Sequence, residues 1–247
     1  MKAIFEKEWG LYFSTPIGYV FLGIFAFFSG LYFWMNNILF GTTDFYAFFN
    51  GFLTILLIIV PILTMRSFSE ERKTRSDQLL LTAPISVWDI ILGKFLAAFA
   101  VYAVALAITL IYPLILAFMG GSIDWGVLFG SYIGYLMLGV VFIAGGLFVS
   151  NLTESQVVAV IGTIGLLLIF VLVDSLAQYI TILNTQNSVL AFLYRIFMTV
   201  LSWFALMARY ETFSLGMVEL PALVYYLSFA AVFLFLTGMK IEQRRWN

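Results

Sequence analysis

Long uncharged stretches alternate with short charged ones along the whole chain. Asp, Glu, Lys and Arg are absent from six stretches: residues 9–43, 45–65, 95–123, 125–153, 155–173 and 220–239. Each can hold the roughly 20 apolar residues that a helix needs to cross a bilayer. A transmembrane β-barrel would alternate apolar and polar residues, and runs such as Leu166 to Val173 do not alternate. The pattern predicts an all-α integral membrane protein with six transmembrane helices, folded as a single domain over residues 1–247.

The composition agrees with this class and excludes several kinds of chemistry. Hydrophobic residues make up 63% of the chain and charged residues 10%, so most outer faces must contact lipid. The chain has no His and no Cys, which removes zinc motifs, Ser-His or Cys-His pairs and thiolate chemistry. The pair Gly93-Lys94 is followed by Phe95 and has no glycine-rich loop before it, so no P-loop is present. We expect no catalytic residue, metal or cofactor in this chain, and no nucleic-acid partner.

The cations indicate the orientation of the helices in the membrane. Ten of the twelve Lys and Arg residues fall in three places: near the N-terminus, between Arg66 and Lys94, and near the C-terminus. The positive-inside rule places these segments in the cytoplasm. With six spans, the turn around Glu154 shares that side, and the segments around Asp44, Asp124 and Arg195 lie on the other. We therefore predict cytoplasmic N- and C-termini.

The first 15 residues predict a short amphipathic helix. One face carries the apolar residues Met1, Ile4, Phe5, Trp9 and Tyr12, and the other carries Lys2, Glu6 and Lys7. Ser14-Thr15-Pro16 ends the pattern. Such a helix would lie along the membrane surface, although a plain extension of the first span is the alternative. The apolar run that follows is too long for a cleaved signal peptide, so we expect the first span to remain in place.

The loop over residues 66–89 is the most charged part of the chain. Nine of the 25 charged residues lie between Arg66 and Lys94. Glu71 and Arg75 are four residues apart in the order that favours a helical ion pair, and Pro84 interrupts a helix. Two short helices joined by a turn are predicted. The loop could serve only as a topology signal, but its acidic residues favour a surface that contacts a soluble protein.

Two further segments carry patterns of their own. The fourth span contains Gly126, Gly130, Gly134, Gly139, Gly145 and Gly146, which permit close helix contacts within one subunit or, alternatively, across a dimer interface. In the segment 178–221, the apolar residues Leu190, Leu193, Phe197 and Leu201 recur at helical steps, and Arg195 and Arg209 interrupt the apolar pattern. We expect helices at or in the outer leaflet there, with a seventh span between Val189 and Met207 as the competing interpretation.

Four stretches together resemble a known family. They are the sequence from Glu71 to Ser86 with the nearby Leu92 to Phe95, the opening from Phe5 to Pro16, the turn from Ser150 to Gln156, and the ending from Glu242 to Trp246. All resemble the cytoplasmic segments of ABC-2-type transporter permeases. The resemblance is closest to the permeases of gliding motility and of nitrous oxide reductase maturation. In that branch one polypeptide supplies six spans and a separate polypeptide supplies the ATPase.

The resemblance implies roles for three sets of residues. A connecting helix before the first span would include Phe5, Glu6, Lys7 and Trp9. A coupling element that fits a groove of the ATPase would include Glu70, Glu71, Arg72, Lys73, Arg75, Asp77, Leu80, Ala83 and Pro84. A second cytoplasmic turn would contribute Thr153, Glu154 and Gln156.

The resemblance also implies partners. Two copies of a separate ABC ATPase would bind Mg-ATP, and a second permease, identical or related, would complete the transporter. An extracytoplasmic accessory protein can also take part, and membrane lipid surrounds the spans.

Together these features predict the permease subunit of an ATP-driven exporter in the bacterial cytoplasmic membrane, working by alternating access. Spans two and five would line the pathway, with Thr54, Pro61 and Thr163 as candidate positions. An ATP-independent secondary transporter or channel is the alternative, but it would usually need paired intramembrane charges or rings of polar residues, which the spans lack. A membrane scaffold that docks a soluble protein is the third interpretation.

Overall fold

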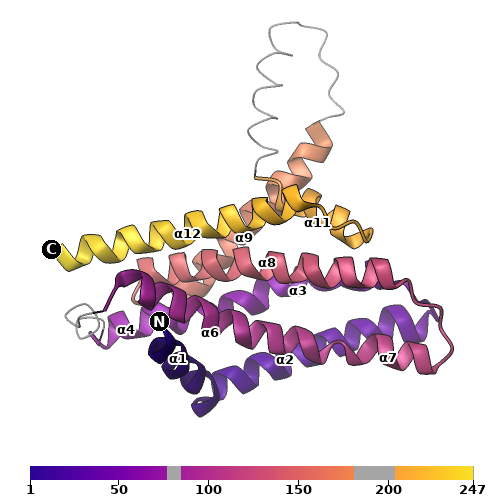
Figure 1. Ribbon diagram of the computed structural model, residues 1–247, viewed down its shortest axis with the longest axis horizontal. Coiled ribbons are helices and arrows are strands. Elements are labelled where there is room, and N and C mark those ends of the chain that lie inside the picture. The colour runs from indigo at the N-terminus through magenta and orange to yellow at the C-terminus, as the bar shows by residue number, and fades with distance from the viewer. Residues whose placement is uncertain (77–84, 181–203, 247) are drawn as a thin grey trace, which may run out of the picture.

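The computed structural model describes residues 1–76, 85–180 and 204–246, with side chains described except at 174–180 and 246 (Figure 1). Within these ranges every regular element is helical. The helices are α1 (Lys2–Ser14), α2 (Pro16–Phe33), the π-helix η1 (Trp34–Leu39), α3 (Phe45–Thr64), α4 (Arg66–Lys73), α6 (Val87–Ile108), α7 (Ile111–Phe118), α8 (Trp125–Leu152), α9 (Gln156–Ile180), α11 (Leu206–Ser214) and α12 (Leu220–Trp246).

Six helical stretches in the described residues are long enough and apolar enough to cross a membrane. They are α2 with η1, α3 with α4, α6 with α7, α8, α9 and α12. These stretches fall on the six uncharged segments of the sequence. The prediction of an all-α protein with six spans is therefore confirmed.

Residues between the uncharged segments start and stop the helices. Asp44 caps α3 by accepting a hydrogen bond from the backbone N–H of Tyr46 at 2.8 Å. Asp124 caps α8 in the same way, accepting from Gly126 N at 2.9 Å and Val127 N at 3.3 Å. A carboxylate at this position satisfies backbone donors that have no partner inside the helix. Two of the lone acidic residues that separate apolar runs in the sequence, Asp44 and Asp124, are thus helix caps in the structure.

The helix α8 lies at the centre of the bundle. Inside the molecule, 72% of its spanning window is buried, against 22% for α9. Its glycines allow the close contacts: a Cβ at Gly139 would lie 2.1 Å from Cε1 of Tyr102, and one at Gly146 would lie 2.1 Å from Oγ1 of Thr64. Gly130 and Gly134 contact residues of α11 and the chain just after it. These glycines therefore serve packing within the subunit, the first of the two predicted uses.

The two termini and α4 gather at one end of the bundle, and α7 and α11 lie toward the other (Figure 1). The turn between α8 and α9 contacts α4, so it belongs to the first end as well. This arrangement agrees with the predicted alternation of the spans. Assignment of this end to the cytoplasm stays a prediction. We refer to it below as the charged end.

The segment 178–221 is described only in part. Residues 181–203, which include most of the alternative seventh span, lie outside the described residues. Beyond them, α11 is helical as expected and packs on α8 and α9. The start of α11 is held by Tyr226 of α12, whose Oη donates a hydrogen bond to the carbonyl oxygen of Leu206 at 2.6 Å.

The predicted apolar face of α1 is wrong in part. The buried residues are Ile4, Glu8 and Tyr12, whereas Met1 is 50% exposed. Ile4 and Glu8 contact α6, and Tyr12 donates a hydrogen bond to the carbonyl oxygen of Leu63 in α3. Phe5 and Trp9 form a neighbouring half-buried stripe, with ring centroids 6.2 Å apart. The face of α1 that carries Glu8 is buried because the Glu8 carboxylate pairs with the buried Lys94 of α6.

The predicted structure of the charged loop also needs correction. α4 follows α3 after a single turn residue, Met65, and ends at Lys73. Arg75 then adopts a left-handed conformation with φ of 56°, so it cannot form the predicted helical pair with Glu71. The rest of the loop, where the second short helix is predicted, includes residues 77–84. These residues, which include Asp77, Leu80, Ala83 and Pro84, lie outside the described part of the chain.

Candidate coupling site at the charged end

A buried lysine connects three helices at the charged end. Lys94 of α6 is 2% exposed, and its Nζ lies 2.7 Å from Oε1 of Glu8 in α1 and 2.8 Å from Oε1 of Glu71 in α4. The same Nζ donates a hydrogen bond to the carbonyl oxygen of Ser67 at 2.7 Å. An ammonium group has three donors, so this one is fully satisfied. A buried charge is tolerated only with such partners.

The helix α1 is held against α6 at further points. A Cβ at Gly93 would lie 2.8 Å from Cγ2 of Ile4, which shows how closely the two helices approach. The N-terminal amine of Met1 lies 3.2 Å from the carboxylate of Asp89. Lys7 reaches Glu71 of α4 at 3.5 Å. The predicted connecting helix is thus fixed to both α6 and α4.

The junction between α3 and α4 is fastened to α8. Ser150 of α8 accepts hydrogen bonds on Oγ from the backbone N–H groups of Phe68 and Ser69, both at 3.2 Å. It donates to the carbonyl oxygen of Met65 at 2.9 Å. Donors in the first turn of a helix lack intrahelical acceptors. The hydroxyl group of Ser150 therefore provides hydrogen bonds to backbone groups at the junction of α3 and α4.

A second cluster of polar side chains connects α4 to the turn after α8 and to α12. Arg72 lies 3.1 Å from Glu154 and donates to the carbonyl oxygen of Asn151 at 3.2 Å. Arg244 of α12 donates to Oδ1 of Asn151 at 3.1 Å and also to its carbonyl oxygen. Asn151 Nδ2 in turn donates to the carbonyl oxygen of Thr237 at 3.2 Å. Asn151 is buried and lies at the centre of this group.

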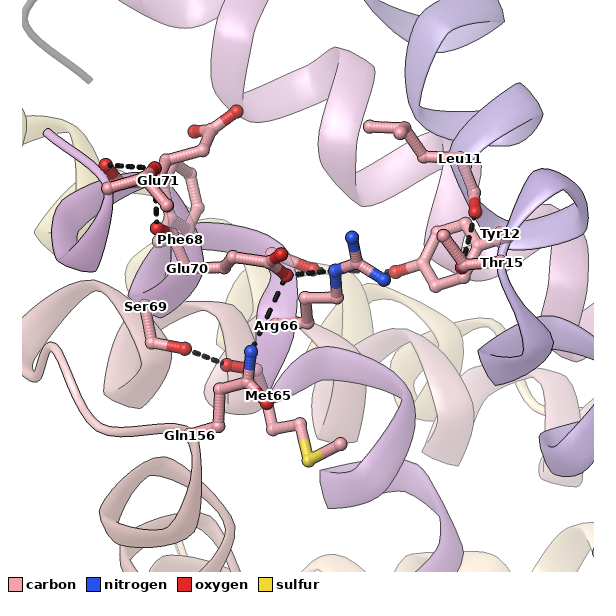
Figure 2. Close-up of polar contacts among 12 residues, drawn as sticks. Leu11, Tyr12, Thr15, Met65, Arg66, Phe68, Ser69, Glu70, Glu71 and Gln156 are labelled. Atoms are coloured by element: carbon pink, nitrogen blue, oxygen red, sulfur yellow. Dashed lines mark hydrogen bonds and ion pairs between the residues drawn. The ribbon is translucent and has the colours of Figure 1, made fainter. Parts of the chain in front are cut away.

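Figure 2 shows a third contact, near the start of α4. Arg66 forms an ion pair with Glu70, and Glu70 accepts a hydrogen bond from Nε2 of Gln156 at 3.4 Å. Ser69 donates to the carbonyl oxygen of Met65 in the same view. The contacts involving α4 thus reach α1, α6, α8 and α9. We call this network of ion pairs and hydrogen bonds at the charged end the polar junction.

The structure brings some of the predicted residues together and separates others. Lys7, Glu70, Glu71, Arg72, Glu154 and Gln156 belong to the polar junction. Lys73 and Arg75 are exposed at the end of α4, and Glu6 pairs with Lys2 at 3.7 Å on the outer face of α1. Thr153 accepts a hydrogen bond from Ser155 N at 3.1 Å inside its own turn.

The candidate pathway residues differ in exposure. Thr54 of α3 is exposed. Pro61 is buried, and so is Thr163 of α9, whose Oγ1 donates to the carbonyl oxygen of Ala159 at 2.7 Å. A role in transport stays a prediction for all three.

The residues of the junction that were missing from the predicted sites include Glu8, Arg66, Lys94, Ser150, Asn151 and Arg244. One of them carried a usable signal. Glu8 lies midway between Ile4 and Tyr12 at steps of four, so an apolar stripe with a carboxylate inside it predicts a buried cation nearby. Ser150 and Asn151 carry no such signal, because their hydrogen-bond partners at the α3–α4 junction and in α4 lie 85 and 79 residues away in the sequence.

A comparison with known protein families identifies the family of this chain. A family model described as ABC-2 family transporter protein matches residues 17–239. A comparison with curated proteins finds no match. The matched range begins in the first turn of α2, includes all six spans and the charged loop, and ends within α12. Since the match extends over most of the chain, the protein belongs to the ABC-2 transporter family.

Proposed function

We propose that this protein is the transmembrane permease subunit of an ATP-binding cassette exporter. It moves substrate across the membrane by alternating access, driven by ATP hydrolysis on a separate subunit. Membership of the ABC-2 family supports a transport role. The polar junction supports the link to a soluble ATPase, because it ties the charged loop to most of the spans.

The observation that carries the proposal is the position of α4. It continues α3 with one intervening residue, and its side chains contact α1, α6 and the α8–α9 turn through ion pairs and hydrogen bonds. A partner that pushes on the end of α4 would therefore move α3 and its neighbours together. Closure of two ATPase subunits on ATP can supply that displacement.

In the proposed assembly the ATPase binds the segment that includes Glu70, Glu71, Arg72, Lys73 and Arg75, together with the chain up to Pro84. Two ATPase copies hold Mg-ATP, and two permease chains form the pathway between spans two and five. The junction faces the cytoplasm of a bacterium, with both termini on that side. We place the chain in the branch that serves gliding motility or nitrous oxide reductase maturation, where an extracytoplasmic accessory protein can participate.

The alternatives receive less support from the structure. A secondary transporter would need charged groups within the spans to couple ion and substrate. Among the described side chains, the buried charged residues are Glu8 and Lys94, and both belong to the polar junction at the charged end. A scaffold that only docks a soluble protein would not require the ion pairs and hydrogen bonds that connect α4 to the spans.

Co-purification tests the proposal. The full chain, expressed with its neighbouring genes and extracted in mild detergent, should carry a stoichiometric P-loop ATPase. Reversing two exposed charges at the end of α4, with Lys73→Glu and Arg75→Glu, should reduce the bound ATPase without changing the amount of permease in the membrane. The matched control is Lys2→Glu, an exposed charge reversal at the same end of the bundle. If no ATPase accompanies the unmodified chain, the exporter proposal is wrong.

A further inference from the structure

Side chains from three other helices donate hydrogen bonds to carbonyl oxygens around the α3–α4 junction. The pairs are Tyr12 Oη of α1 with Leu63 at 3.2 Å, Ser150 Oγ of α8 with Met65 at 2.9 Å, and Lys94 Nζ of α6 with Ser67 at 2.7 Å. In a regular helix the carbonyl oxygens bond to N–H groups of the same helix. The α3–α4 junction therefore depends on its neighbours as well as on its own backbone.

The hydroxyl group of Ser150 lies within the backbone hydrogen bonds of this junction. In an uninterrupted α-helix the N–H of Phe68 would donate to the carbonyl oxygen of Thr64. Here it donates to Oγ of Ser150 at 3.2 Å, and the same hydroxyl donates to the carbonyl oxygen of Met65. A side chain that inserts between backbone groups in this way interrupts a helix.

Gly146 allows α8 to come close enough for this contact. It precedes Ser150 by four residues, so the two positions share one face of α8. A Cβ at Gly146 would lie 2.1 Å from Oγ1 of Thr64, the last residue of α3. The missing side chain at position 146 thus lets the Ser150 hydroxyl reach the backbone of the junction.

An interrupted helix is a place where a chain can bend, because hinges form at the ends of elements. Bending at Met65 would absorb a displacement of α4 before it reached α3. The same bending would separate Ser150 and Tyr12, both buried, from their backbone partners. Buried polar groups left without partners are unfavourable. The hydrogen bonds from α8 and α1 therefore oppose bending at the junction.

We propose that Ser150 and Tyr12 are positioning residues that stiffen the α3–α4 junction, so that a displacement of α4 moves α3 as well. This inference rests on the proposed function, in which an ATPase pushes on α4. Both side chains are buried, so they act through α3 and α4 and not through contact with the ATPase.

The stiffness of the junction can be measured without any ATPase. The sequence contains no cysteine, so spin labels on Ile58→Cys in α3 and Lys73→Cys in α4 report only these two exposed positions. Double electron–electron resonance on the detergent-purified full chain should give a narrow distribution of distances. Adding Ser150→Ala should broaden it, because three hydrogen bonds to the junction are lost.

The matched control is Ser131→Ala, at another buried serine nearer the start of α8, which should leave the distribution narrow. If Ser150→Ala does not fold, Tyr12→Phe decides the question. This variant removes the hydroxyl that bonds to Leu63 and keeps the ring, and it should broaden the same distribution. Equal widths in the unmodified chain and in the variants at positions 150 and 12 would overturn the proposal.

A second label pair tests transmission into the spans. Ile58→Cys in α3 and Val157→Cys in α9 are exposed positions on the two spans of the proposed pathway. With the co-purified ATPase bound, Mg-ATP should shift this distance, and Ser150→Ala should abolish the shift while the ATPase stays bound. Equal shifts with and without Ser150→Ala would overturn the role of Ser150. If Mg-ATP causes no shift in the chain that keeps Ser150, the exporter proposal is wrong.

Discussion

Lys94 has an environment that would be unfavourable for an isolated charge. Its ammonium group is buried, and water cannot solvate it. Two carboxylates and one carbonyl oxygen replace that water at 2.7–2.8 Å. The partners come from α1 and α4, so the interactions that compensate for the burial of Lys94 also hold three helices in one arrangement.

We predict that Lys94→Met destabilises the protein by about 3–5 kcal/mol, because it removes the buried ammonium group that pairs with both Glu8 and Glu71. Thermal unfolding of the purified chain in detergent should show a clear drop in Tm. Adding Glu8→Gln and Glu71→Gln to the same chain should recover much of the loss, because no unpaired buried charge then remains, and Lys7, which also loses Glu71, is half exposed. Unchanged Tm in the single variant would mean that the lysine is not paired as described.

The same residues show where reasoning from sequence ends. The charge at position 94 was visible, but it was grouped with the loop before it, as part of a topology signal. Its true partners lie 86 and 23 residues away along the chain. Helical spacing can suggest that Glu8 is buried, whereas the identity of its partner depends on how α1 and α6 pack.

At the scale of elements, the spans were predictable because each is free of charge over the width of a bilayer. The ends of the helices were predictable in part, because Asp44 and Asp124 interrupt the uncharged sequence where they cap α3 and α8. The expected pair between Glu71 and Arg75 did not form, because Glu71 is drawn to Lys94 and Lys7 and the helix ends before Arg75. Local spacing was overridden by contacts with distant elements.

Contact between α6 and α8 gives a prediction at this scale. Gly139→Ala would place a Cβ 2.1 Å from the Tyr102 ring, which also donates a hydrogen bond to the carbonyl oxygen of Tyr135 at 2.8 Å. Overpacking of this kind costs about 1–3 kcal/mol, so Tm should fall. Gly165→Ala in α9 is the control, because nothing lies within 4 Å of that Cβ and alanine favours helix. Equal behaviour of the two variants would contradict the close contact.

For the whole molecule, the sequence predicted the class, the number of spans and the family, since these depend on features spread along the chain. The gathering of N-terminus, charged loop, Glu154 turn and C-terminus at one end followed from the even number of spans. The detailed junction did not follow, because Ser150 and Asn151 act through hydrogen bonds to distant backbone groups. Its ion pairs and hydrogen bonds connect α4 to α1, α6, α8 and α9, so we expect these helices to move together with α4.

The central claim is that a soluble ATPase contacts the charged end at α4, and site-directed crosslinking tests it most directly. The sequence contains no cysteine, so a single introduced thiol is unique. Lys73→Cys places it at the exposed end of α4, and Phe118→Cys places it at the opposite end of the bundle, where Phe118 is 92% exposed (Figure 1).

With the ATPase co-expressed and a short thiol-to-amine crosslinker, we predict an adduct of permease and ATPase from Lys73→Cys and none from Phe118→Cys. An adduct from Phe118→Cys, or none from Lys73→Cys while the ATPase stays bound, would contradict the account.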